Sequence, residues 1–237
     1  MSSLNRAFTR LSMSRRYESW FRRFGLADSS GGWWLRYLLA NPGRQGCPGL
    51  SDAAPVQIWA TWFPRDAQPE TFIQEFPIDA LHVSVRRGAF FLEAGPNRIE
   101  DASCRGAFEV RGHRLSWDLR YHSNFGLTLS NKGWIGFSRT PHSDTIFSGE
   151  IRLDDQILRG EPLGFGAQGH NSGFRHRRFW TWTHACFSQS DGRLSTFEAL
   201  VYNSLARARL KLRLRNPARA QEFVTDGGSV LEMTGDY

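Results

Sequence analysis

The segment ARARLKLRLR, residues 206–215, alternates between apolar and basic side chains. Successive side chains of a β-strand point to opposite faces, so this period of two predicts a strand with one covered and one solvated face. Glycine, proline, aspartate or asparagine separates most of the other strand-like segments, and no long segment has a helical period. The pattern predicts an all-β fold, an antiparallel barrel or sandwich. The other predicted strands are residues 33–40, 56–63, 71–78, 89–94, 106–110, 115–121, 145–153, 156–163, 179–187, 193–202 and 229–233.

The residues between the predicted strands indicate how the strands are connected. The sequence RGH at residues 111–113 predicts a hairpin, because a glycine in so short a link accepts the positive φ of a tight turn. Residues 41–49 are rich in proline and glycine and predict a loop. Residues 121–142 contain several glycines and asparagines, which favours a lid or binding segment.

The N-terminal part departs from the strand pattern. Residues 1–16 are rich in serine and arginine and lack the apolar run of a secretory signal, which predicts a flexible leader. Residues 17–24, YESWFRRF, place arginines among four aromatic side chains. We interpret this segment as a short helix that packs on the body of the protein with its arginines in solvent.

The richest stretch runs from Gly164 to Phe187. In its first half, Gln168, His170 and Asn171 lie between glycines that let the backbone bend. In its second half, a strand over residues 179–187 places alternate side chains on one face. A mostly apolar wall with a few placed polar groups is typical of a ligand pocket. The alternative is that the polar groups bond to the backbone in a turn and the tryptophans are ordinary core. The face in question carries Trp180, Trp182, His184 and Cys186.

Two carboxylates on other strands are candidate acids. Asp118 follows the core-facing Trp117 and shares its face with Arg120, so it is either half of a surface ion pair or a cavity carboxylate. Glu198 lies in the strand predicted over residues 193–202.

Composition narrows the classes of function. The net charge of +7 comes almost entirely from arginine, and no nucleic-acid motif accompanies it, so we expect no nucleic-acid partner. No apolar run approaches the roughly 20 residues of a membrane span. The three cysteines are widely spaced, which predicts reduced thiols in a cytoplasmic protein. No P-loop, dinucleotide fingerprint or Ser-His-Asp order occurs, and the spacing of His170, His176 and His184 matches no metal site, so we expect neither cofactor nor metal.

Several phrases occur together in the order known from one family. They are YESWF (17–21), WLRY (34–37), LSWDL (115–119), GAQGHNSG (166–173), WTWTH (180–184) and FE (197–198). In these phrases the chain resembles the tocopherol cyclase-like and carotenoid 1,2-hydratase-like group, also called hydroxyneurosporene synthase-like. The resemblance implies a lipocalin-like β-barrel over residues 17–163 and an incomplete second barrel over residues 164–237. Members of the group hydrate, cyclise or fold polyene and terpenoid substrates.

The chain departs from the family pattern at two positions. Ser172 stands where the group usually has tryptophan, so part of the aromatic wall is missing. Gly169 stands where some hydratase-like members have aspartate, which removes a carboxylic acid next to His170.

We therefore expect a cofactor-independent cyclase, isomerase or hydratase that acts on a hydrophobic terpenoid or polyene-like molecule. His170, Asp118 or Glu198 would supply the proton that such chemistry on an alkene needs. Asn171 and Gln168 would orient a polar head group. The alternative is a non-catalytic binder of a lipid or isoprenoid, or a degenerate member of the family that has kept the pocket and lost the chemistry, since a small barrel has room for one such ligand. The side chains expected to line the cavity are Trp117, Trp180, Trp182 and His184.

Overall fold

The structure is a computed structural model, and it describes residues 17–39, 56–84, 90–123, 129–132, 136–173, 180–188, 194–204, 207–215 and 220–226. The predicted leader at 1–16, the loop at 41–49 and the strand at 229–233 lie outside these ranges. The chain divides into two compact units, Met1–His176 (unit 1) and Arg177–Tyr237 (unit 2). The boundary predicted at residue 164 falls within a strand that belongs to unit 1.

Unit 1 is built almost wholly from strands. In chain order they are β1 (Tyr17–Leu26), β2 (Gly31–Leu39), β3 (Val56–Pro64), β4 (Glu70–Phe76), the short 3₁₀ helix η1 (Ile78–Ala80), β5 (Leu81–Ser84), β6 (Phe91–Ala94), β7 (Asn97–Glu100), β8 (Ser103–Val110), β9 (His113–Ser123), β10 (Leu129–Lys132), β11 (Gly136–Leu153) and β12 (Gln156–Gly173).

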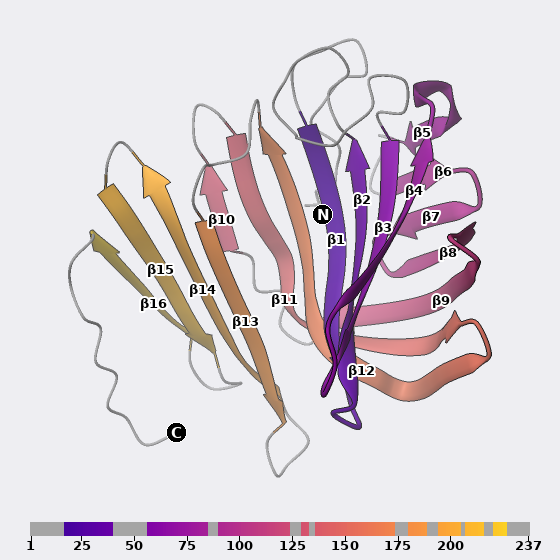
Figure 1. The fold of residues 1–237 in the computed structure, drawn as a ribbon. Helices are drawn as coiled ribbons and strands as arrows, with labels where there is room; N and C mark the ends of the chain where they lie inside the picture. The colour runs from indigo at the N-terminus through magenta and orange to yellow at the C-terminus, as the bar shows by residue number, and fades with distance from the viewer. Residues whose placement is uncertain are drawn as a thin grey trace. The chain divides into compact units, whose positions relative to one another are not determined.

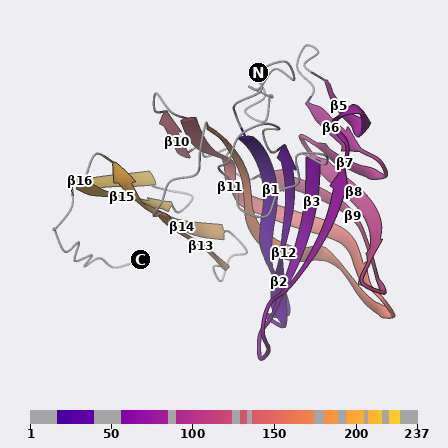
Figure 2. The ribbon, with the colours of Figure 1, turned by 45° about the horizontal axis from the view of Figure 1, so that its top comes forward.

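These strands form one antiparallel sheet in the order β4-β3-β2-β1-β12-β11-β9-β8-β7-β6-β5, with β10 paired to β11. The predicted all-β fold is confirmed. The sheet curves round until it nearly closes into a barrel (Figure 1). Its order places β1, the first strand, between β2 and β12, the last strand of the unit (Figure 2). This pairing brings together residues that are far apart in the sequence.

The end strand β4 contacts the β8–β9 hairpin across the sheet through side chains. The Arg111 guanidinium donates a hydrogen bond to the carbonyl oxygen of Thr71 at 2.6 Å. The rings of Phe72 and His113 meet edge to face at 5.4 Å, and His113 Nε2 lies 3.9 Å from Glu70 Oε1. These contacts join β4 to the β8–β9 hairpin. The hairpin itself forms as predicted, because Arg111 and Gly112 both adopt positive φ, 53° and 82°.

The segment predicted as a helix at residues 17–24 is a strand. Residues of β1 alternate with period two between the two faces of the sheet, and Trp20, Phe24 and Leu26 join the hydrophobic core. Arg22 points to the same face as these core residues and is fully buried, so the expectation that the arginines are in solvent is wrong for Arg22. The segment is held as a strand because β1 is hydrogen-bonded on both sides, to β2 and to β12.

The predicted glycine-rich bend at residues 164–173 is also strand. It is the second half of β12, paired with β1 without a break from Gly164 to Gly173. The glycines there allow close approach: an added Cβ at Gly166 would lie 1.9 Å from the carbonyl oxygen of Arg23 in β1.

Unit 2, as far as it is described, is a four-stranded antiparallel sheet in the order β13-β14-β15-β16. The strands are β13 (Trp180–Ser188), β14 (Leu194–Ser204), β15 (Arg207–Arg215) and β16 (Ala220–Asp226). The first three match predicted strands, and β16 was not predicted. Across the described residues of both units, no helix is long and apolar enough to cross a membrane.

Candidate functional site

The inner face of unit 1, meaning the face whose side chains join the hydrophobic core, changes from apolar to polar along β1. Leu26, Phe24 and Trp20 are core residues, and Arg22 and Glu18 occupy the remaining inward positions. Both charged side chains are 0% exposed. Charged groups are seldom fully buried unless they are paired or bind something, so this end of the face is a candidate site.

β12 continues the polar end beside β1. Its inward positions are Gln168, His170 and Ser172, and all three are buried. In the pairing of the two strands, His170 lies opposite Trp20 and Gln168 lies opposite Arg22. Directly paired residues share a face, so the polar groups of both strands gather in one place.

Glu18 and His170 form a buried pair at the centre of this region. His170 Nε2 lies 2.7 Å from Glu18 Oε1, and both side chains are 0% exposed. The imidazole ring stacks on the Trp20 indole, with ring centroids 5.0 Å apart and planes inclined by 14°. Trp20 in turn stacks on Phe90 at 5.7 Å. A contact this short needs a proton between the two atoms, so an ionised Glu18 fixes the proton on Nε2.

Arg22 occupies the next inward position of β1. Its guanidinium donates to the carbonyl oxygens of Phe21 at 3.1 Å and Glu100 at 3.2 Å, and lies 4.8 Å from the centre of the Tyr121 ring. Burial raises the pKa of Cys104 to about 12, although the charge of Arg22 acts in the opposite sense. Burial also raises the pKa of Tyr121, again against the charge of Arg22. The groups around Arg22 are therefore shielded from water.

β11 contributes further ionisable groups, and its Arg139 lies opposite His170 in the strand pairing. His142 lies opposite Gln168 in the strand pairing. Burial lowers the pKa of His142, and the nearby charge of Asp144 opposes that shift. Asp144 is 0% exposed and accepts a hydrogen bond of 2.5 Å from Ser123 Oγ. The polar region thus spans β1, β12, β11 and the end of β9.

The three polar residues predicted to act together are divided between the faces of β12. Gln168 and His170 point inward. Asn171, the residue after His170, is on the outer face, where Ser138 Oγ donates to its Oδ1 at 2.8 Å. The alternation of the strand separates neighbours in sequence. Asn171 therefore does not share the interior with His170, and its predicted role beside Gln168 is corrected.

Gly169 is also on the outer face, where Phe21 covers it. An added Cβ would lie 1.9 Å from the Phe21 ring. An aspartate at this position would not reach the interior that holds His170. The carboxylate that contacts His170 is that of Glu18, from another strand.

Asp118 and Trp117 have the positions of a surface and a core residue. Asp118 is exposed, so it does not lie among the buried side chains of the interior. Trp117 is 3% exposed, and its Nε1 donates to the Tyr37 hydroxyl at 3.2 Å. Its ring meets Phe108 edge to face. Trp117 is thus packed in the core, and its partner Tyr37 lies opposite Trp20 in the pairing of β1 with β2.

The remaining predicted residues lie in unit 2. Trp182 Nε1 donates to Glu198 Oε1 at 2.7 Å, and Glu198 is 2% exposed. Trp182 stacks on His184 with ring centroids 5.6 Å apart, so these three side chains form one group within the sheet. Trp180 is the first residue of β13, and its side chain lies outside the described set.

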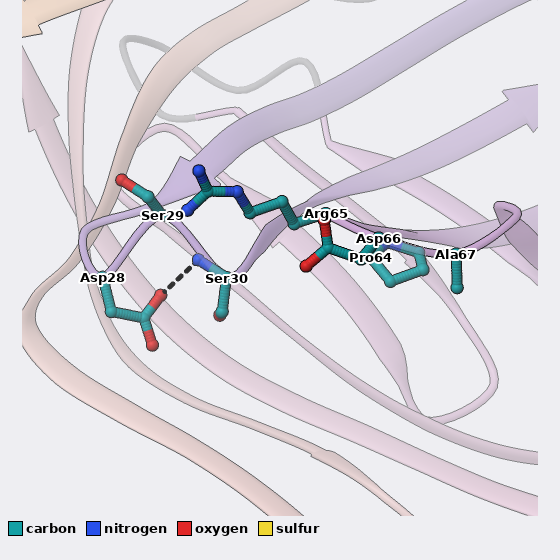
Figure 3. Close-up of a pocket in the computed structure, with 7 residues that line it drawn as sticks. All are labelled: Asp28, Ser29, Ser30, Pro64, Arg65, Asp66 and Ala67. Atoms are coloured by element: carbon teal, nitrogen blue, oxygen red, sulfur yellow. Dashed lines mark hydrogen bonds between the residues drawn. The ribbon is translucent and has the colours of Figure 1, made fainter.

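A shallow depression lies at the β1–β2 and β3–β4 turns (Figure 3). Asp28 Oδ1 accepts a hydrogen bond from the Ser30 amide at 2.9 Å. No aromatic side chain lines this depression, so it is not the aromatic pocket that the sequence predicts. Its lining residues are Asp28, Ser29, Ser30, Pro64, Arg65, Asp66 and Ala67.

Sequence reasoning missed Glu18 and Arg22. The sequence of β1 gives no clear period of two, and residues 18–22 are all buried in the structure. Among the described residues, no group of three or more His, Cys, Asp or Glu side chains is placed to hold a metal ion.

The curved antiparallel sheet with a polar inner end defines unit 1 as a barrel-type all-β protein. No family model and no curated protein matches the sequence. The crystal structure of CghA with Sch210972 has the same fold, with a TM-score of 0.60 at 11% identity over 85% of this chain. A second crystal structure of CghA gives a TM-score of 0.56 at 9% identity over 90% of this chain.

The chain spans 58% of the CghA chain in the first comparison and 75% in the second. At such low identity the likeness shows the fold alone. The tocopherol cyclase-like family inferred from the motifs remains a prediction.

Proposed function

We propose that this protein binds a hydrophobic small molecule in the barrel of unit 1 and that the Glu18–His170 pair transfers a proton to and from it. The reaction class is a cofactor-independent isomerisation, cyclisation or hydration of a terpenoid or polyene-like chain. The observation that carries the proposal is the fully buried carboxylate–imidazole contact of 2.7 Å, stacked on an indole.

The chemistry follows from the groups present. An imidazolium held by Glu18 protonates an alkene carbon, which leaves a carbocation on the ligand and a neutral imidazole. Loss of a proton from a neighbouring carbon to His170 completes an isomerisation or, after attack by a second alkene, a cyclisation. Addition of water followed by proton return completes a hydration. The Trp20 face beside His170 stabilises positive charge through its quadrupole.

Glu18 has a positioning role in this scheme. Its carboxylate fixes the orientation of the imidazole and stabilises the imidazolium form, as the carboxylate partners of catalytic histidines do elsewhere. Exclusion of water strengthens both effects, because the attraction between opposite charges grows as the local dielectric constant falls.

The second candidate function is non-catalytic binding of the same class of ligand. It is favoured by the complete burial of the pair, since Glu18 and His170 already satisfy each other and would then be structural. The fold likeness to CghA, crystallised with Sch210972, is compatible with both functions.

The test is to incubate the protein with a mixed isoprenoid and polyene extract and to follow bound species and products by mass spectrometry. We expect a retained ligand and its conversion to an isomer or hydrate. His170→Gln should abolish conversion and keep retention, while the outer-face variant Asn171→Ala should convert normally. Retention without conversion in the wild type supports the binder, and no retention contradicts both functions.

Glu198 remains an alternative proton donor, and Trp182 a ligand contact, in unit 2. Glu198→Gln keeps an oxygen that can accept the hydrogen bond from Trp182, so it tests the acid without removing that bond. We expect conversion to persist in this variant. Loss of conversion with an intact fold would move the chemistry to unit 2.

A further inference from the structure

Arg22 is a buried cation for which the described residues provide no anion. Its side chain is 0% exposed, and none of the described carboxylates lies within ion-pair distance of the guanidinium. Its two hydrogen bonds go to neutral backbone carbonyls, and Nε has no hydrogen-bond partner among the described residues. A buried charge is costly unless it is paired, so the arrangement calls for a further group.

Two other unsatisfied polar atoms lie in the same part of the inner face. His142 Nδ1 and Ser172 Oγ are buried and have no hydrogen-bond partner among the described residues. Arg22, Gln168 and His142 stand in register on three adjacent strands, β1, β12 and β11. Ser172 lies opposite Glu18, next along the same two strands. These side chains can all donate hydrogen bonds, which is the composition of a site for an anion.

The nearby carboxylates are already engaged. Glu18 is paired with His170, and Asp144 accepts a hydrogen bond from Ser123. Asp101, whose charge acts on Tyr121 and His142, accepts a hydrogen bond from the Phe90 amide at 3.2 Å. The aromatic contacts of Arg22 also leave its charge in place, because the Tyr121 ring face attracts a cation without neutralising it. A purely structural role for Arg22, as a bridge from β1 to the carbonyl oxygen of Glu100, would be served as well by a neutral donor.

We propose that Arg22 is the anchor for a carboxylate head group, and that the ligand of this barrel is an apolar chain that ends in a carboxylic acid. The inference rests on the proposed function and specifies its substrate class. Arg22 binds the carboxylate, Gln168 and His142 lie beside it on the neighbouring strands, and the apolar chain follows the aromatic inner face. A guanidinium suits this task because its planar donors match both oxygens of a carboxylate.

The test uses cis-parinaric acid, a fluorescent polyene acid, and its methyl ester, titrated into the full-length protein. We expect the acid to bind at least about tenfold more tightly than the ester, because only the acid forms charge-assisted hydrogen bonds with Arg22. Arg22→Met should lower the affinity for the acid to that for the ester and leave the ester unchanged. Arg22→Lys should keep a part of the preference for the acid.

The matched control is Arg36→Met. Arg36 lies on the outer face of β2, where its Nε donates to Ser19 Oγ at 2.8 Å and its guanidinium faces Trp34 and Trp59. Its loss should leave the preference for the acid intact. If Arg22→Met does not fold, as judged by circular dichroism, the ratio of acid to ester affinity in the wild type decides.

Each outcome has a separate meaning. Equal affinity for acid and ester in the wild type overturns the carboxylate anchor and leaves hydrophobic binding standing. A preference for the acid that survives in a folded Arg22→Met protein overturns the assignment to Arg22. Absence of binding for both probes overturns the anchor together with the proposed function.

Discussion

At the scale of single residues, the buried Glu18–His170 contact should contribute to the stability of unit 1. Removal of one partner of a buried pair leaves the other unsatisfied, so Glu18→Ala should lower the free energy of unfolding by about 3 kcal/mol. Replacement of both residues by leucine should cost less than the sum of the costs of Glu18→Leu and His170→Leu. Urea unfolding of the wild type, these two single variants and the double variant measures the coupling energy. Strict additivity would show that the pair contributes no interaction energy.

Cys104 provides a residue-scale test of how closed the interior is. Burial raises its pKa to about 12, so at pH 8 only about one thiol in ten thousand is ionised. We expect the Cys104 peptide to stay unmodified when native protein is treated with iodoacetamide, and to react fully in urea. Cys186 is partly exposed and should react before Cys104. Rapid native alkylation of Cys104 would contradict the closed interior.

At this scale the sequence indicated candidate residues but not the side chains that they contact. Composition marked His170 and Gln168, which do lie on the inner face, but the sequence could not pair His170 with Glu18 because the contact depends on β1 lying beside β12. Asn171 was misplaced because a bend was expected where a regular strand alternates its faces.

At the scale of elements, β12 depends on glycines at its contact with β1. An added Cβ at Gly166 would meet backbone, the Arg23 carbonyl oxygen, whereas at Gly169 it would meet the movable Phe21 ring. We therefore expect Gly169→Ala to cost about 1–3 kcal/mol and Gly166→Ala to cost more. Thermal and urea unfolding measure both.

The matched control replaces Phe21, whose ring lies against Gly169, by the smaller leucine. Phe21→Leu combined with Gly169→Ala should recover part of the lost stability, while Phe21→Leu should not relieve Gly166→Ala. The reverse order of the two glycine variants would show that the strands separate more easily than the ring moves.

Strands with clear alternation, such as β3, β9 and β15, were predicted close to their observed bounds. The strands β5, β7 and β16 were missed, because four to seven residues carry too little periodic signal. β1 was mistaken for a helix because its aromatic and arginine residues occur on both faces, so its sequence shows no clear alternation.

At the scale of the whole molecule, the division at His176 makes unit 1 a candidate for independent folding. Residues 1–176 contain every strand of the large sheet and the complete Glu18–His170 and Arg22 region. We expect this part alone to unfold cooperatively and to keep the preference for parinaric acid over its ester. Loss of ligand affinity in a folded 1–176 protein would show that unit 2 completes the site.

The join between β4 and the β8–β9 hairpin has a consequence for access. Among the described residues it consists of the Arg111 guanidinium on a carbonyl oxygen and near the Phe72 ring, the Phe72–His113 ring contact and a 3.9 Å approach of His113 to Glu70, with no ladder of backbone hydrogen bonds. Separation there breaks few bonds and leaves every strand pairing of the sheet intact. We expect a large ligand to reach the buried Glu18–His170 pair by separation of β4 from the β8–β9 hairpin, while the strand pairing of the sheet is kept.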